Sequence, residues 1–362
     1  MTAHVHILSD GFTSPNARAF AFPLLRHRRA LGEAGITLRF FAKDAAALTD
    51  CDLLIVDSKH FTGPERGQPD HVRRTLESFR SRCDATVWFD TTDSAGWVFG
   101  GALEIAKAYY KNQMLADRTR YLEPMHGRRA PSDFYHRHGG ITDPQGDDAP
   151  QVRDAALLDR LQVSWNSGLA DYSHFGPRRM AAYRHLRCDA LLQWPRRFAN
   201  PHGPRPNEVS CRFGIAYDRP SVAHQRLEIR HRLADRMPTD KLARGAYLHE
   251  METSRVVVSP FGLGEITLKD FEVFLSGALL LKPDMGHMET WPDLFRDGES
   301  MRAFAWDLDD LETTLADALA NPDRSAEIAA AGQAHYRSFV NDTTGRDAFV
   351  ARFGEIVTRE AA

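Results

Sequence analysis

Residues 256–283 read VVVSPFGLGEITLKDFEVFLSGALLLKP, and this stretch decides the fold. An apolar run at 255–260 is followed by a glycine turn, a helical pattern at 267–277 that ends on glycine, and a second apolar run at 278–283. Strand, turn, helix and strand in this order predict a unit in which a helix connects two parallel strands.

The same alternation extends in both directions. Strands are predicted at 4–9, 37–42, 52–58 and 85–91, with helical patterns at 17–35 and 69–82. Further along we predict a strand at 209–217, helices at 221–237 and 242–254, a strand at 301–306, and helical stretches from Leu308 onward. The prediction is an α/β protein with two Rossmann-like, doubly wound domains facing a cleft.

The middle of the chain, 96–206, has a looser pattern that is broken by glycine and proline, which predicts loops and a linker. We therefore place the first domain at 1–206 and the second at 207–345. A last helix at 346–362 is expected to pack back on the first domain. A cleft between two domains is a preferred place for a ligand.

Charge and composition exclude several classes of protein. The 46 Lys+Arg and 49 Asp+Glu give a net charge of −3, so we expect no nucleic-acid partner. The four cysteines lie far apart in sequence, which indicates neither a zinc site nor a disulfide framework. No apolar run approaches the ~20 residues of a transmembrane helix. We expect a cytoplasmic protein without a cleaved leader.

The glycine turn carries the clearest chemical signal. Gly262 and Gly264 permit a close backbone approach, and Thr267 with Asp270 forms a capping-box pattern at the helix start. Amides at a helix N-terminus suit a phosphate group. Glu272 follows about a turn and a half later, where its carboxylate could bind ribose hydroxyls. A tight strand-to-helix connection with a surface glutamate is the alternative.

At these residues the sequence resembles the donor-binding domain of GT-B glycosyltransferases, in particular group 1 enzymes of bacterial surface-polysaccharide (lipopolysaccharide or capsule) assembly. Their pattern is Glu-Gly-Phe-Gly-Leu-Pro-x-x-Glu-Ala-x-x-x-Gly. Superposing Glu272 on the second Glu places Gly264 at the first, with Glu265 one position later. The resemblance implies that the first acid lies near the donor sugar and the second binds the ribose. It extends over about 100–320, including YKNQ from Tyr110 and SWNSG from Ser164.

Further donor-binding candidates flank the first helix of the second domain. Arg219 and Arg226 would lie above the carboxyl end of its first strand, where in similar enzymes a basic residue neutralises the diphosphate through bidentate contacts. Tyr247 could stack on the base. As isolated residues, the two arginines could equally face solvent and the tyrosine could be part of the core.

A catalytic base is expected from the first domain, opposite the donor. An inverting transfer needs a carboxylate or imidazole within hydrogen-bond reach of the acceptor hydroxyl. Residues that follow strand ends are the candidates, in the order Asp93, Asp10 and His60. Each aspartate could instead cap a helix or close a turn.

We predict no metal and no cofactor, because the leaving diphosphate in this fold is normally stabilised by amides, the helix dipole and cations. His126, His136 and His138 lie close in sequence but lack a helical His-x-x-x-His motif with its glutamate. Residues 171–206 hold seven arginines. A solvated surface is the simplest interpretation, and contact with an anionic membrane at the inner face of the cell is the alternative.

Three functions follow from these patterns. The leading hypothesis is a metal-independent glycosyltransferase that moves a sugar from a nucleotide sugar to a glycan, lipid-linked or small-molecule acceptor. The alternative is a non-catalytic nucleotide-sugar or glycan-binding protein on the same scaffold. A nicotinamide-dependent dehydrogenase is disfavoured, because the first turn, SDGFTS from Ser9, lacks Gly-x-Gly-x-x-Gly.

Overall fold

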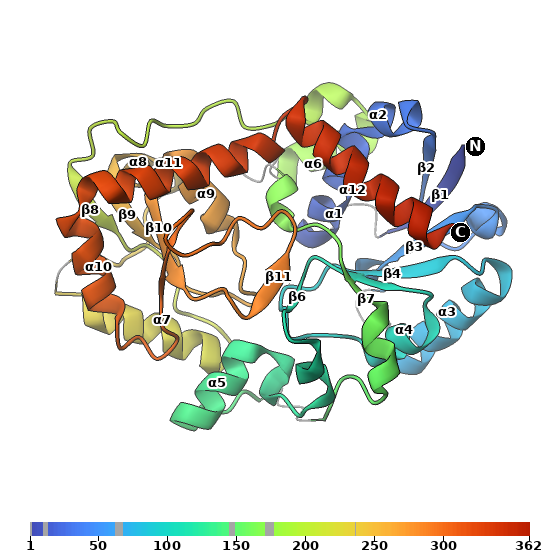
Figure 1. The fold of residues 1–362 in the computed structure, drawn as a ribbon, viewed down its shortest axis with the longest axis horizontal. Coiled ribbons are helices and arrows are strands. Elements are labelled where there is room, and N and C mark those ends of the chain that lie inside the picture. Colours follow the sequence, from blue (N-terminus) through green and yellow to red (C-terminus); the bar gives the residue numbers. More distant parts are fainter. Residues whose placement is uncertain (1, 10–13, 62–67, 145–148, 171–176, 236) are drawn as a thin grey trace.

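The computed structural model describes residues 2–9, 14–61, 68–144, 149–170, 177–235 and 237–362. They form two lobes that lie side by side, each built on a parallel sheet with helices on both faces (Figure 1). The predicted α/β class with two Rossmann-like domains is confirmed.

The first lobe has a six-stranded sheet with the order β2-β1-β3-β4-β5-β7, and all its strand pairs are parallel. Its strands are β1 (Ala3–Leu8), β2 (Ile36–Phe41), β3 (Leu53–Asp57), β4 (Thr86–Asp90), β5 (Tyr109–Lys111) and β7 (Leu161–Val163). Its helices are α1 (Pro15–Arg26), α2 (Arg28–Glu33), α3 (Pro69–Arg82) and α4 (Gly100–Ile105).

Both faces of this sheet are buried. Ile55 and Phe89 belong to the core cluster that includes α1, whereas the alternate residues Val56 and Trp88 belong to the cluster that includes α3 and α4. Successive side chains of a strand point to opposite faces, so strands covered on both sides become continuous apolar runs. This explains why the sequence shows unbroken apolar stretches here.

The second lobe has a parallel sheet with the order β12-β10-β9-β8. Its strands are β8 (Asn207–Ser210), β9 (Ser254–Val258), β10 (Leu279–Pro283) and β12 (Arg302–Phe304). Its helices are α7 (Pro220–Leu233), α8 (Arg244–Thr253), α9 (Leu268–Ser276), α10 (Leu311–Ala320) and α11 (Pro322–Phe339). The strand expected at 209–217 is shorter than predicted, because the ladder to β9 ends at Ser210.

The middle segment is not simply loop and linker, which corrects the expectation for 96–206. It supplies β5 and β7 to the first sheet, and β6 (Gln113–Leu115) pairs antiparallel with β11 (Met288–Thr290) of the second lobe. It also holds α5 (Ala130–Gly139), whose Tyr135 hydroxyl accepts a hydrogen bond from Gln225 of α7, and α6 (Pro177–Leu186). Strands of three residues are too short to show periodicity in the sequence.

The last helix, α12 (Thr344–Glu360), runs from the second lobe back along the first (Figure 1). Its Phe349 and Phe353 pack edge-on against Trp165. The Glu360 carboxylate accepts a hydrogen bond from the Tyr110 hydroxyl at 2.6 Å. Among the helices described, none combines the length and apolarity needed to cross a membrane.

Candidate functional site

A cationic cavity of about 540 Å³ opens between the two lobes. The first lobe and the segment before α5 contribute most of its wall, and the second lobe contributes Arg219 and Leu263. The lining residues are Lys59, Thr92, Asp93, Ser94, Trp97, Gly127, Arg128, Arg129, Arg219 and Leu263. Four cations around one acid make this cavity suited to an anion.

Two of the cations come from the Gly127-Arg128-Arg129 turn. Arg129 is 4% exposed and donates to the Gly262 carbonyl at 2.8 Å and to the Ser132 hydroxyl at 3.3 Å. Its Nε has no hydrogen-bond partner among the described residues. The Arg128 guanidinium lies 4.9 Å from the centre of the Trp97 ring. Burial lowers the pKa of both arginines, so an anion would relieve an unfavourable desolvation.

Arg219 faces this cavity from the start of α7. Its NH1 lies 3.6 Å from the Asp143 carboxylate, beyond hydrogen-bond distance, and has no hydrogen-bond partner within the described part of the chain. Asp143 is itself held by the Ser221 amide and hydroxyl at 2.9 and 2.8 Å. Arg219 is thus oriented by a fixed carboxylate and retains capacity for a ligand.

Asp93 lies at the border between this cavity and a second one. Its side chain is exposed, and Asn16 donates to it at 2.7 Å while also donating to the Thr91 carbonyl at 2.8 Å. The second cavity, the polar pocket, is lined by Asn16, Ala19, Phe20, Thr91, Asp93, Asn112, Gln113, Trp165, Asn166, Ser167 and Ile266. Asp93 therefore lines both cavities.

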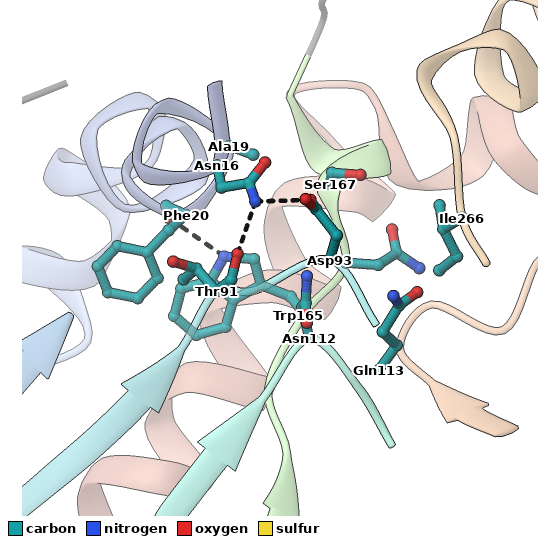
Figure 2. A pocket seen from close by; sticks show the side chains of 11 residues that line it. Asn16, Ala19, Phe20, Thr91, Asp93, Asn112, Gln113, Trp165, Ser167 and Ile266 are labelled. Atoms are coloured by element: carbon teal, nitrogen blue, oxygen red, sulfur yellow. Dashed lines mark hydrogen bonds between the residues drawn. The ribbon is translucent and has the colours of Figure 1, made fainter. Parts of the chain in front are cut away.

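The polar pocket offers hydrogen-bond acceptors. Figure 2 shows Asn112 and Gln113 on the wall below Asp93, with Asn16 above it. Asn112 Oδ1 and Gln113 Oε1 are both buried and lack partners among the described residues. Buried polar atoms are normally hydrogen-bonded, so these two amide oxygens retain the capacity to accept hydrogen bonds from water or from a hydroxyl group.

The other two catalytic candidates lie elsewhere. Asp10 falls outside the described residues. His60 ends the short helical turn η2 (Ser58–His60), packs edge-on against Phe61, and is not among the residues that line the two cavities. Of the three candidates, the structure brings only Asp93 to the cleft within the residues it describes.

The phosphate site expected at the glycine turn stays a prediction, and the structure shows how the turn is held without a ligand. The Gly262 amide donates to the Gly264 carbonyl at 3.0 Å, so it is used within the turn. The capping box is present, and the Thr267 amide donates to the Asp270 carboxylate at 2.7 Å. The first turn of α9 is therefore capped by the chain's own acid, which repels an anion.

Gly264 lies where the glycine turn approaches the first lobe. A Cβ at this position would lie 2.0 Å from the Asp93 carbonyl oxygen, so only glycine allows the turn to approach the first lobe. Gly264 thus permits a close backbone approach between the two lobes.

Replacing Gly264 by alanine is expected to destabilise the protein by about 1–3 kcal/mol, the usual cost of overpacking. Urea unfolding measures the change in the free energy of unfolding. Gly262→Ala is the matched control, because the nearest atom to its added Cβ is Thr267 Cγ2 at 3.5 Å. Equal stability of the two variants would contradict the close approach.

Glu265 is fully buried at the same contact between the lobes. Its carboxylate accepts hydrogen bonds from the Ala95 amide at 2.9 Å and from Gln113 at 3.3 Å. Burial raises the pKa of Glu265, but His287, Arg129 and the Ala95 amide favour the carboxylate more strongly, so its pKa is lowered to about 2. Glu265 thus joins the lobes as a carboxylate behind the cavities.

The remaining donor candidates lie on three helices of the second lobe, Arg226 on α7, Tyr247 on α8 and Glu272 on α9. Glu272 is 9% exposed, and its two oxygens meet Arg244 at 2.7 Å and the Tyr247 hydroxyl at 3.2 Å. Arg226 donates to the Phe261 carbonyl at 2.7 Å and the Gly214 carbonyl at 2.8 Å. None of Glu272, Tyr247 and Arg226 lines either cavity. Arg226 supports the glycine turn, and Tyr247 is held by Glu272.

Sequence reasoning gave no role to Asn112 and Gln113, although both lie in the YKNQ stretch of the resemblance, and it missed Arg128 and Arg129. The turn GRRAP at 127–131 was interpreted only as a break in the pattern. Two adjacent arginines in a loop between predicted elements are the signal that could have identified Arg128 and Arg129, since loops on a rigid scaffold often carry functional residues.

Two sequence features stay outside the site. His126 and His136 stack with ring centroids 4.0 Å apart, and no cluster suited to a metal ion exists among the described residues. In the arginine-rich segment Arg178, Arg187, Arg196 and Arg197 are exposed. Arg205 instead donates to the carbonyls of Glu252, Ser254 and Ser276, so it fixes the second lobe internally.

Comparison with known proteins adds a finding for the second lobe. Its residues 223–341 match a family model described as glycosyl transferase-like. This part of the chain is glycosyl transferase-like. The match confirms, over these residues, the likeness to glycosyltransferases that the sequence indicates. No curated protein sequence matches the chain.

Solved glycosyltransferase structures align over nearly the whole length at low identity. Anabaena Alr3699/HepE in complex with UDP and glucose is 12% identical, with 99% of this chain and 100% of that chain covered and a TM-score of 0.47. The lipopolysaccharide outer core galactosyltransferase WaaB is 9% identical, with 99% and 100% covered and a TM-score of 0.46. MurG of Acinetobacter baumannii is 11% identical, with 99% of each chain covered and a TM-score of 0.37.

Proposed function

We propose that the protein is a glycosyltransferase that moves a sugar from a nucleotide sugar to an acceptor hydroxyl in the cleft. The observation that carries this proposal is the position of Asp93, between a cavity walled by cations and a pocket with unpartnered amide oxygens. The glycosyl transferase-like match supports it, because the matched domain supplies Leu263 to the cationic cavity.

In this proposal the diphosphate of the donor binds Arg128, Arg129 and Arg219. Asp93 takes the proton of the acceptor hydroxyl while the oxygen of that hydroxyl forms a bond to the anomeric carbon. The bond from that carbon to the diphosphate oxygen breaks, and its electron pair leaves with the diphosphate, whose charge the arginines stabilise. Direct displacement of this kind inverts the anomeric configuration.

The sugar and the ribose have their own partners in the proposal. Sugar hydroxyls donate to Asn112 Oδ1 and Gln113 Oε1, the two oxygens without partners in the described structure. The ribose binds Glu272 after Arg244, whose side chain is 55% exposed, turns away from it. The arginines supply the positive charge that a divalent metal supplies in other transferases, so transfer is proposed to be metal-independent.

Thermal-shift titration with UDP-, GDP-, CMP- and dTDP-sugars and with NAD tests the proposal. We expect stabilisation by one class of nucleotide sugar, and transfer that persists after EDTA treatment. Stabilisation by NAD alone would contradict the proposal. Binding of a nucleotide sugar without turnover across an acceptor panel would support the alternative, a non-catalytic binding protein. Loss of transfer in EDTA with recovery in Mg²⁺ or Mn²⁺ would contradict the metal independence alone.

A further inference from the structure

A third cavity, the aromatic pocket, lies in the first lobe beside the cationic cavity. Its volume is about 60 Å³. Four of its nine lining residues are aromatic, and the full set is Ser58, Lys59, Phe61, Val72, Trp88, Asp90, Thr92, Trp97 and Phe99. A single water needs about 10–15 Å³, so the pocket has room for a group of several heavy atoms.

The wall of this pocket is ordered by its own packing. Trp88 stacks on Phe61 with ring centroids 5.8 Å apart, and Phe99 lies 6.0 Å from Trp88. Thr92 is fixed by a hydrogen bond of 2.6 Å from the buried Lys111 ammonium. Protein interiors are close-packed, so a cavity held open by fixed rings indicates a binding site for an apolar group.

The Trp88 indole indicates that a group bound in the aromatic pocket also carries a hydrogen-bond acceptor. Trp88 is 3% exposed, and its Nε1–H has no hydrogen-bond acceptor among the described residues. A buried indole N–H normally finds a partner. A ligand oxygen attached to an aromatic ring would satisfy this donor while the ring packs against Phe61 and Phe99.

The aromatic pocket and the cationic cavity share walls. Lys59, Thr92 and Trp97 line both, and Asp93 follows Thr92 directly. A molecule with a hydroxyl at Asp93 can therefore extend past Thr92 into the pocket. We propose that the acceptor carries a compact aromatic ring with an attached oxygen, which binds the aromatic pocket. Assigning this ring to the acceptor rests on the proposed function, whereas its binding to the pocket does not.

The test uses benzyl alcohol as the aromatic probe, with prenol and glycerol as the branched apolar and polar comparisons. In ¹⁵N-labelled protein we expect benzyl alcohol to shift the Trp88 Nε1–H signal saturably, prenol to bind more weakly, and glycerol to leave the signal unchanged. Val72→Leu narrows the pocket and is expected to weaken benzyl alcohol binding about tenfold, because the longer side chain occupies space that the ring needs.

Trp88→Phe keeps the ring and removes the donor, and ligand-detected titration is expected to show about fivefold weaker binding. Trp291→Phe, whose ring packs on Phe339 away from the pocket, is the matched control and should bind as the parent does. Equal binding of the three probes, tighter prenol binding, or unchanged affinity in both pocket variants would overturn the inference. Pyrophosphate binding to the parent protein, measured in parallel, reports on the cationic cavity alone. Absence of pyrophosphate binding would count against the proposed function and not against the aromatic pocket.

Discussion

Arg219→Ala is expected to lower the affinity for pyrophosphate and for UDP about tenfold to a hundredfold, because a hydrogen bond between charged groups contributes about 1.5–3 kcal/mol. Arg219 lines the cationic cavity, and its Nη1 has no hydrogen-bond partner among the described residues, although it forms an ion pair with the buried Asp143 carboxylate at 3.6 Å. Asp143 keeps its hydrogen bonds from Ser132 and Ser221 in the variant. Isothermal titration calorimetry at two salt concentrations measures the affinity.

The matched control for this variant is Arg230→Ala on the same helix. Arg230 pairs with the exposed Asp240 at 3.1 Å and is not a cavity residue, so the affinity should stay within about twofold of the parent, as for other surface pairs. Arg219→Lys should give an intermediate affinity, because lysine retains the charge without bidentate geometry. Equal affinities of the alanine variants would place the anion elsewhere.

Asp93→Asn is expected to reduce kcat about 10²- to 10⁴-fold, the usual contribution of a general base. The asparagine oxygen can still accept the hydrogen bond from Asn16, so the local structure and the affinity for UDP should be preserved. Once a donor and an acceptor that give product are known, steady-state kinetics with this pair measures kcat and KM separately.

Asp70→Asn is the control for this second variant. Asp70 is an exposed acid in the first turn of α3 in the same lobe, and it lines none of the cavities described above. Its turnover should equal that of the parent. A fully active Asp93→Asn enzyme would exclude Asp93 as the base and direct attention to His60 and Asp10.

Much of the fold was predictable because long, covered elements leave a periodic pattern. Residues 69–82 were predicted as a helix, and α3 has the same bounds. The predicted helix 267–277 and strand 278–283 agree with α9 and β10 within one residue at each end. In contrast β5, β6 and β7 have three residues each, and such short strands are determined by their neighbours rather than by their own pattern.

The site was predictable where one residue follows a strand or precedes a helix, as Asp93 and Arg219 do. It was not predictable where the outcome depends on the other lobe. Gly264 and Glu265 belong to a motif that indicates donor binding, yet both contact the segment Asp93–Ala95 of the first lobe. The residues around a motif do not reveal which distant segment of the chain packs against it. Whether these residues bind a donor stays a prediction.

The return of α12 to the first lobe has a practical consequence for dissecting the protein. Expressing residues 1–206 and 207–362 separately would leave Tyr110 without Glu360 and Trp165 without Phe349 and Phe353. An amino-terminal fragment that keeps the native contacts of the first lobe needs residues 344–360, either added as a separate peptide or joined by a new linker. A purification handle fused directly after Glu360 would likewise crowd the buried Glu360 carboxylate, which accepts the hydrogen bond from Tyr110 of the first lobe.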